Sequence, residues 1–106
     1  MIHSDTEKAF SSRYHEAVEL IGRRWTGCII RAMLEGAKQF SEFTSIIPGL
    51  SDRLASVRLK ELEAAGIVER VVIPEKPVRI EYKLTEKGKD LRPVVEEIDR
   101  WAKRWY

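Results

Sequence analysis

The hydrophobic period of this chain changes near Gly66, and this change constrains the fold more than any other feature. In Gly49–Gly66 (GLSDRLASVRLKELEAAG) the apolar residues recur at helical spacing, whereas polar and apolar residues alternate strictly in Arg79–Leu84 (RIEYKL). A period of about 3.6 residues predicts an amphipathic helix, and a period of about two predicts a half-buried strand. The sequence therefore predicts a mainly helical fold that carries a small β-hairpin, in the α+β class.

Helices are expected throughout the part of the chain that precedes the hairpin. Their ranges are about residues 5–21, 25–34, 41–47 and 51–65, and a glycine or a Pro-Gly pair follows each of them. The second helix is apolar on almost every side, which predicts that it is buried. Ser41 and Ser51 are expected to be the N-caps of the third and fourth helices.

After Gly66, Val68–Ile73 is the expected partner of the strand Arg79–Leu84. The tip between them (PEKP, 74–77) contains two prolines, which stiffen it and cannot continue the ladder. Thr85 is expected to cap a last helical segment, in which Pro93 starts a fresh helix. We expect one domain over residues 1–106, with an N-terminal helix or arm (1–21), a helix-turn-helix (41–65), a hairpin (67–84) and C-terminal helices (86–106).

The composition agrees with one globular domain. A chain of 106 residues has room for a single modest core, and 43% hydrophobic with 34% charged residues is typical of a folded chain. The net charge of +2 is too small to indicate a polyanionic partner, so the positions of the 19 basic residues matter more. No apolar run approaches the roughly 20 residues that span a bilayer, and the start (MIHSDTEKAFSSR) lacks the apolar stretch of a signal peptide. We therefore expect a cytoplasmic protein without a membrane partner.

Two short helices joined by a Pro-Gly turn and followed by a hairpin are the parts of a winged helix-turn-helix. Four segments make this pattern specific by their order and spacing: LIGRRW, QFSEF, PGLSDRLASVRLKELEAAGIVER and IEYKLTEKGKDL. On these segments the chain, from about Val18 onward, resembles the HxlR-type family of bacterial and archaeal transcription regulators. The resemblance implies a winged helix-turn-helix that binds double-stranded DNA as a homodimer.

The helix 51–65 carries residues suited to contact with bases. At about 100° per residue its leucines fall on one side, and Arg53, Ser56, Val57 and Lys60 fall on the other. An arginine can bridge guanine O6 and N7, a serine hydroxyl is adaptable, and an exposed valine can meet a thymine methyl group. Lys60 lies further along the helix and is expected to reach a phosphate. An ordinary solvated face is the alternative, and the position between a Pro-Gly turn and a hairpin favours DNA.

Arg58 is the exception on this helix, because it lies only about 40° from Leu54 and therefore at the inner edge. A guanidinium that leaves water needs partners, and Glu42 or a carbonyl at the turn between the helices is the expected partner. In the family an arginine occupies this position. The resemblance therefore implies that Arg58 supports the turn or reaches a phosphate, and the supporting role is favoured.

Further contacts with the phosphate backbone or the minor groove are expected from Ser41, Ser51, Lys76 and Arg79. Both serines stand at expected helix starts, where free N–H groups and the helix dipole favour a phosphate, although plain capping needs no DNA. Both cations stand at the stiff tip of the hairpin. The family's wing implies that they touch DNA, and a solvated turn is the alternative.

The terminal helices carry apolar and aromatic stripes that a domain of this size is too small to cover. Packing of these stripes back onto the same chain is one possibility. We expect instead a four-helix contact between two copies of the chain, formed by Phe10, Tyr14, Ile98, Trp101, Trp105 and Tyr106. Regulators of this size usually act as twofold dimers on palindromic sites, with half-sites about 10 base pairs apart or a multiple of that.

The sequence does not support the redox switch that many members of this family use. Those members have a cysteine about thirteen residues before the conserved tryptophan, and Ser12 stands there in this chain, where a hydroxyl cannot form the reactive thiolate. The single Cys28 is expected to be a small buried side chain of the apolar second helix. An apolar effector bound among Tyr14, Trp25 and Trp101 is a further hypothesis, less favoured because an aromatic cluster is more often core than pocket.

Enzyme motifs are absent from the sequence, which contains no HExxH, CxxC, Gly-rich phosphate loop or G-x-S-x-G. His3 and His15 do not form a metal-ligand set, so neither a metal nor another cofactor is expected. The expected function is that of a sequence-specific DNA-binding transcription regulator, with repression as its expected mode and the nucleoid as its place when bound. In this hypothesis the helix 51–65 enters the major groove, and the tip 74–79 meets the minor groove or the backbone.

A winged-helix module that joins a larger protein assembly without reading DNA is the alternative function. Such a module should present an acidic or apolar face on its second motif helix and should lack a basic wing. The basic residues of this helix and of the hairpin tip favour DNA instead.

Overall fold

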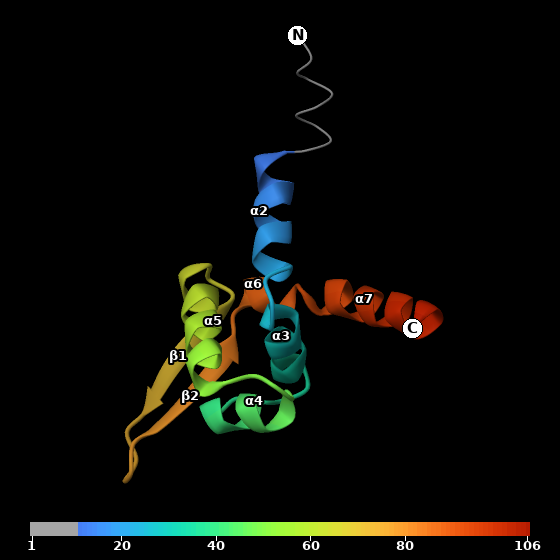
Figure 1. Ribbon diagram of the computed structural model, residues 1–106. Helices are drawn as coiled ribbons and strands as arrows, with labels where there is room; N and C mark the ends of the chain where they lie inside the picture. Colours follow the sequence, from blue (N-terminus) through green and yellow to red (C-terminus); the bar gives the residue numbers. More distant parts are fainter. Residues whose placement is uncertain (1–10) are drawn as a thin grey trace.

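The computed structural model describes residues 11–106 and confirms the expected mainly helical fold with one hairpin (Figure 1). Its helices are α2 (Ser12–Ile21), α3 (Thr26–Leu34), α4 (Phe40–Ile46), α5 (Asp52–Ala64), α6 (Glu86–Lys89) and α7 (Arg92–Trp105). Its strands are β1 (Val68–Ile73) and β2 (Arg79–Leu84). The first part of the helix expected over residues 5–21 lies outside the described residues.

The core lies where α3, α4 and α5 pack together beside the base of the hairpin. Its largest fully buried apolar side chains come from all three helices and are Ile29, Ile30, Phe43, Leu59 and Leu62. The ring of Phe43 also meets Tyr82 of β2 edge to face, with 6.2 Å between the ring centroids. The three helices and β2 thus form one packed base that holds the turn between α4 and α5.

The start of α5 is capped as expected, but the start of α4 is not. The Ser51 hydroxyl accepts a hydrogen bond from Leu54 N at 3.1 Å and caps α5. The predicted cap at Ser41 is wrong, because Gln39 is the N-cap of α4 and its own N–H donates to the Glu42 carboxylate at 2.9 Å. This capping box starts the helix earlier, so Ser41 lies exposed within the first turn.

The Glu42 carboxylate is committed to this cap. Besides the N–H of Gln39, it accepts the N–H of Lys38 at 3.2 Å. These backbone donors, first that of Gln39 and then that of Lys38, hold the pKa of Glu42 below its usual range. Glu42 is therefore occupied at the start of α4.

The hairpin is antiparallel, with Val68 opposite Leu84 and Ile73 opposite Arg79. The strict alternation expected for β2 is only partly observed, because Glu81 is 5% exposed and is the most buried residue of the strand. One of its carboxylate oxygens lies 3.2 Å from Arg79 Nε and 3.7 Å from Lys38 Nζ. Two cations therefore compensate this buried charge, which a pattern based on hydrophobicity cannot anticipate.

Figure 1 shows α2 and α7 extending away from this base in different directions. Neither helix contains a buried residue. Two polar contacts attach α7 to α3: Arg31 Nη1 donates to Asp99 Oδ1 at 2.6 Å, and Arg92 Nη2 donates to the Leu34 carbonyl at 3.2 Å. Across residues 11–106, no helix has both the length and the apolar character needed to cross a bilayer.

Cys28 is exposed, so the expectation that it is buried is wrong. It lines a groove between α3 and α7, together with Val94 and Ile98. The opposite side of α3 faces the core through Ile29 and Met33. Although α3 is apolar on nearly every side, the single chain covers only part of it, because α7 extends away from the base.

Candidate nucleic-acid interface

The two sides of α5 have separate surroundings. Ala55, Leu59 and Leu62 are buried in the core. The Ser51 cap begins the helix, and Gly66, with φ of +75°, follows its end in a conformation that suits glycine. The residues expected to contact DNA lie on the other side and are exposed wholly or in part: Arg53, Ser56, Val57 and Lys60.

The cations on the exposed side of α5 are not neutralised by carboxylates. Within residues 11–106, neither Arg53 nor Lys60 makes an ion pair. An exposed cation without a partner keeps its donors available for a guanine edge or a phosphate. This side of α5 therefore has the chemistry needed for contact with DNA.

Arg58 points into the fold instead. Its Nε donates to the Arg24 carbonyl at 2.9 Å, and its Nη1 donates to the Glu61 carboxylate at 3.2 Å. Its side chain is only 16% exposed. The same carboxylate accepts a hydrogen bond from Arg23 Nη1 at 2.8 Å. Arg58 thus fastens α5 to the segment between α2 and α3.

Both expected partners of Arg58 are wrong. Glu42 caps α4, and the carbonyl that accepts from Arg58 is that of Arg24 between α2 and α3, not one at the turn between α4 and α5. Glu61 lies one helical turn from Arg58 on the same face, so helical spacing was a usable signal for that pair. Arg24 is 34 residues away in the chain, and Arg23 lies 38 residues from Glu61. No pattern in a single sequence indicates contacts over such separations.

The packing of the turn between α4 and α5 against Trp25 was also not predicted from the sequence. Gly49 has φ of +86°, and an added Cβ there would lie 3.2 Å from Cη2 of Trp25. Trp25 itself precedes α3 with φ of +77°. Glycine at position 49 meets both requirements, since it adopts a positive φ freely and leaves room for the indole ring. The LIGRRW segment thus supports the turn that starts α5.

The two cations expected at the hairpin tip differ in their surroundings. Lys76 is exposed, and within residues 11–106 it makes no ion pair. Arg79 Nη1 lies 3.1 Å from Glu75 Oε2, and its Nε lies 3.2 Å from Glu81 Oε2. A phosphate would compete with both carboxylates for Arg79, whereas Lys76 is directly available.

The expected DNA contacts lie toward one end of the molecule. Figure 1 shows α4, the start of α5 and the hairpin tip at the lower end of the view, while α2 extends from the upper end. Ser41 and Ser51 are both exposed at this end, the first inside α4 and the second at the start of α5. The arrangement allows a helix to enter a groove while the hairpin lies beside it.

The apolar stripes of the terminal helices are uncovered in the single chain. The expected contact residues are between 55% and 95% exposed, and they are Tyr14, Ile98, Trp101, Trp105 and Tyr106. The alternative, in which they pack back onto their own chain, is therefore wrong for these residues. Phe10, the remaining member of the set, lies outside the described residues.

The hypothetical effector cluster is not assembled by one chain. Trp25 packs against the core beside Gly49, whereas Tyr14 and Trp101 are exposed on two different helices. Bringing these aromatic rings together would require a second chain.

Most of the chain is similar to known transcription regulators. Residues 20–106 match the HxlR-like helix-turn-helix family. YvaP of Bacillus subtilis (strain 168), an uncharacterized HTH-type transcriptional regulator, is 50% identical over 93 residues, which cover 88% of this chain and 86% of YvaP. The HTH-type transcriptional regulator YodB of the same organism is 47% identical over 90 residues, which cover 85% of this chain and 80% of YodB.

Solved structures agree with these sequence matches. The reduced form of YodB superposes with a TM-score of 0.73 at 44% identity, over 99% of this chain and 95% of the YodB chain. The redox regulator HypR in its oxidized form superposes with a TM-score of 0.83 at 36% identity, over 89% of this chain and 97% of the HypR chain.

Proposed function

This chain belongs to the HxlR-like helix-turn-helix family and is a DNA-binding transcription regulator. We propose that it binds DNA with α5 in the major groove and with the tip 74–79 on the minor groove or the backbone. The chain works by binding, without catalysis, in the cytoplasm and on the nucleoid. The observation that carries the proposal is the division of α5 into an apolar side buried in the core and an exposed side with unpaired cations.

Base contacts come from the first half of α5. Recognition helices usually contact base edges through their N-terminal residues. Arg53, Ser56 and Val57 occupy this half and are exposed wholly or in part, so they read bases. Lys60 lies further along and contacts a phosphate.

Backbone contacts hold this helix in register. Lys76 and Arg79 approach the minor groove or phosphates, and the hydroxyls of Ser41 and Ser51 face phosphates near the helix starts. Arg58 contributes by fixing the position of α5, and a phosphate would have to displace Glu61 to reach its guanidinium. The contacts therefore divide into base readers, backbone contacts and one supporting arginine.

A homodimer places two such helices on one operator. The exposed stripes of α2 and α7 include Tyr14, Trp101 and Trp105, and large aromatic side chains of this kind bury about 150–250 Å² each when covered. A twofold contact between them presents the two copies of α5 to a palindromic operator with half-sites about 10 base pairs apart, or a multiple of that. Repression is the proposed mode, in which the dimer occupies promoter DNA.

Selection from a pool of random-sequence double-stranded DNA tests this proposal and requires no chosen operator. The full chain should enrich sites that contain an inverted repeat at this half-site spacing. Enriched sites without twofold symmetry would contradict the dimer, and the absence of any enriched sequence would contradict base recognition by α5. A reporter placed behind the enriched site should lose expression when the protein is present, and a gain would contradict repression.

A further inference from the structure

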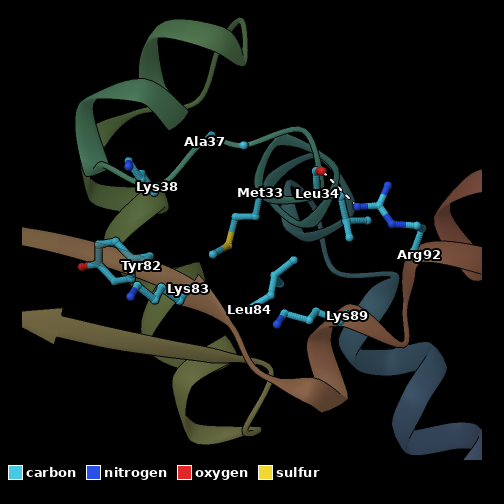
Figure 2. A pocket seen from close by; sticks show the side chains of 10 residues that line it. Met33, Leu34, Ala37, Lys38, Tyr82, Lys83, Leu84, Lys89 and Arg92 are labelled. Atoms are coloured by element: carbon cyan, nitrogen blue, oxygen red, sulfur yellow. Dashed lines mark hydrogen bonds between the residues drawn. The ribbon is translucent and has the colours of Figure 1, made fainter.

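A cavity of about 430 Å³ lies apart from the proposed DNA and dimer contacts and shares no residue with them (Figure 2). It is bounded by the end of α3, the loop that precedes α4, the second half of β2, α6 and the start of α7. Pockets for small molecules usually have volumes of roughly 300–1,000 Å³. The cavity is therefore large enough for a small ligand.

The cavity has an apolar floor. Met33 and Ala37 are buried in the core, and Tyr82 and Leu84 of β2 are partly buried. Figure 2 shows Met33 and Leu84 in the middle of the view, where the ends of α3 and β2 approach each other. These side chains offer a hydrocarbon or aromatic group an apolar surface against which it can leave water.

Cations surround this floor, and none of the described residues that line the cavity is acidic. Figure 2 shows Lys38, Lys83, Lys89 and Arg92 around the central apolar side chains. Within residues 11–106, Lys83 makes no ion pair. Lys89 makes one at 3.5 Å, with a Glu86 side chain that is 95% exposed, which adds little because water screens it.

The other two cations are committed only in part. Lys38 Nζ lies 3.7 Å from Glu81, whose carboxylate is also shared with Arg79. Arg92 donates from Nη2 to the Leu34 carbonyl, which leaves further donors of its guanidinium available. Several like charges around one cavity repel one another, so an anion placed among them gains from all of them.

We propose that this cavity binds a small carboxylate with an apolar body. The carboxylate lies on the side of Lys89 and Arg92, where charge-assisted hydrogen bonds are strong, and Lys83 on the other side of the apolar floor adds attraction at longer range (Figure 2). The apolar body covers Met33 and Leu84. Both features are needed, since the cations alone would hold any anion weakly in water and the floor alone would not distinguish an acid from an alcohol.

The cavity connects the parts that the proposed function uses. Lys38, through its carbonyl, accepts the N–H of Tyr82 at 2.7 Å, so the loop before α4 is tied to the strand that carries the wing. Arg92 ties the start of α7 to the end of α3. A bound carboxylate competes for Arg92 and adds negative charge beside β2, which DNA phosphates disfavour. It therefore binds the DNA-free state more tightly and lowers DNA affinity. This regulatory step rests on the proposed function, whereas the binding step does not.

Titration calorimetry of the full chain with 2-naphthoate tests the binding step. The acid should saturate one site per chain, and 2-naphthalenemethanol, its neutral analogue, and inorganic phosphate should each bind at least tenfold more weakly. The double substitution Lys83→Gln with Lys89→Gln should weaken naphthoate at least tenfold. Lys103→Gln, which removes an exposed cation outside the cavity, should leave it unchanged.

Other outcomes would overturn the site. Equal binding of the alcohol would indicate a purely apolar surface, and equal binding of phosphate would indicate a general anion site. Naphthoate binding that persists in the double variant but is lost in Trp101→Glu would place the acid on the exposed aromatic stripe. Thermal unfolding of each variant shows that the loss does not come from misfolding.

DNA binding, followed by fluorescence anisotropy with a selected operator, tests the regulatory step. Saturating naphthoate should lower the affinity about fivefold, the smaller end of typical allosteric couplings. Unchanged affinity with the cavity occupied would overturn the regulatory step. If the double variant binds DNA more weakly without any acid, the cations contact DNA directly, which overturns regulation from a separate site. Absence of DNA binding, with naphthoate binding intact, would reject the proposed function and leave the ligand site standing.

Discussion

α5 and α7 are amphipathic helices of similar length, 13 and 14 residues, but their apolar sides have different surroundings. α5 buries Ala55, Leu59 and Leu62 in the core of its own chain. α7 buries no residue and exposes Ile98, Trp101 and Trp105. The two helices therefore show that an apolar stripe predicts burial but does not say which molecule provides the cover.

The difference comes from how each helix is attached. α5 is fastened to the base by the turn at Gly49, which packs against Trp25, and by the contact of Arg58 with the Arg24 carbonyl. α7 is attached near its start and middle by polar contacts of Arg92 and Asp99 with α3, and the rest extends away (Figure 1). α5 is thus fixed for contact with DNA, while α7 offers its stripe to another surface.

The largest expected effect is the loss of the dimer in Trp101→Glu. A charge in the centre of the stripe would be buried without a partner, which opposes association. Because a dimer gains from simultaneous contact with two half-sites, the monomer should bind the operator about 10²–10⁴-fold more weakly. Sedimentation and DNA titration measure both effects. Arg100→Glu, on the polar side of the same helix, is the matched control, and an unaltered dimer in Trp101→Glu would reject the interface.

Core packing gives the next largest difference between the two helices. Leu59→Ala should lower the free energy of unfolding by about 2–5 kcal/mol, since it removes a fully buried side chain. Ile98→Ala, in the monomeric Trp101→Glu background, should change it by less than about 0.5 kcal/mol. Chemical denaturation of each variant gives these values. Equal losses at both positions would mean that α7 packs on its own chain.

Removal of the Arg53 side chain tests the polar side of α5. Arg53→Ala should weaken operator binding by about 1–3 kcal/mol and relax the preference at one base pair of each half-site. Competition with operators substituted at single positions measures both. Arg100→Ala, which removes a cation from α7, serves as control. Unchanged affinity and base preference in Arg53→Ala would show that α5 docks differently.

A smaller and less specific effect is expected at the hairpin tip. Lys76→Ala should weaken binding to operator and random DNA alike, by less than about 1 kcal/mol, because a phosphate contact carries no sequence information. The slope of log affinity against log salt concentration should become shallower by about one unit, since one phosphate contact is lost. Titrations at several salt concentrations provide the slope. A loss confined to the operator would mean that Lys76 reads a base.

The smallest expected effect concerns the attachment of α7 through Asp99. Arg31, with a smaller contribution from Lys103, holds the pKa of this carboxyl below its ordinary value of 3.8. Since the folded-state pKa is the lower one, the pair stabilises the fold above the ordinary value and loses this effect as the pH falls through the depressed one. The pH dependence of unfolding should therefore be shallower in Asp99→Asn below about pH 4. An identical profile would mean that the pair contributes nothing.

Several features of the fold were predictable because they depend on neighbouring residues. The helices, the hairpin and the Ser51 cap follow from periodicity and from local hydrogen bonding. The cap of α4 was missed although its signal was local, because Gln39 and Glu42 form a capping box that a nearby serine obscured. The roles assigned to the residues that contact DNA remain predictions.

Other features depended on contacts that no local pattern encodes. The buried Glu81 meets Lys38, which comes from a distant segment, and Cys28 is exposed because α7 covers only part of α3. Among the cations of the carboxylate cavity, Lys38 likewise comes from a segment far from the other three, which lie within residues 83–92. Hydrophobicity indicates which side chains tend to be buried, but their burial in the fold depends on which helices and strands pack against them.

By itself, the sequence determined the order of the elements, the family and the chemistry of the exposed side of α5, because periods and motifs are properties of neighbouring residues. Helical spacing already placed Arg58 at the inner edge of α5 and Arg53 on its outer side, and only the tertiary structure decided which groups hold Arg58. The same residue type has these two surroundings because packing brings the Arg24 carbonyl, 34 residues away, to Arg58, while the exposed side of α5 faces solvent. A guanidinium takes the role that its partners allow, and folding brings those partners together.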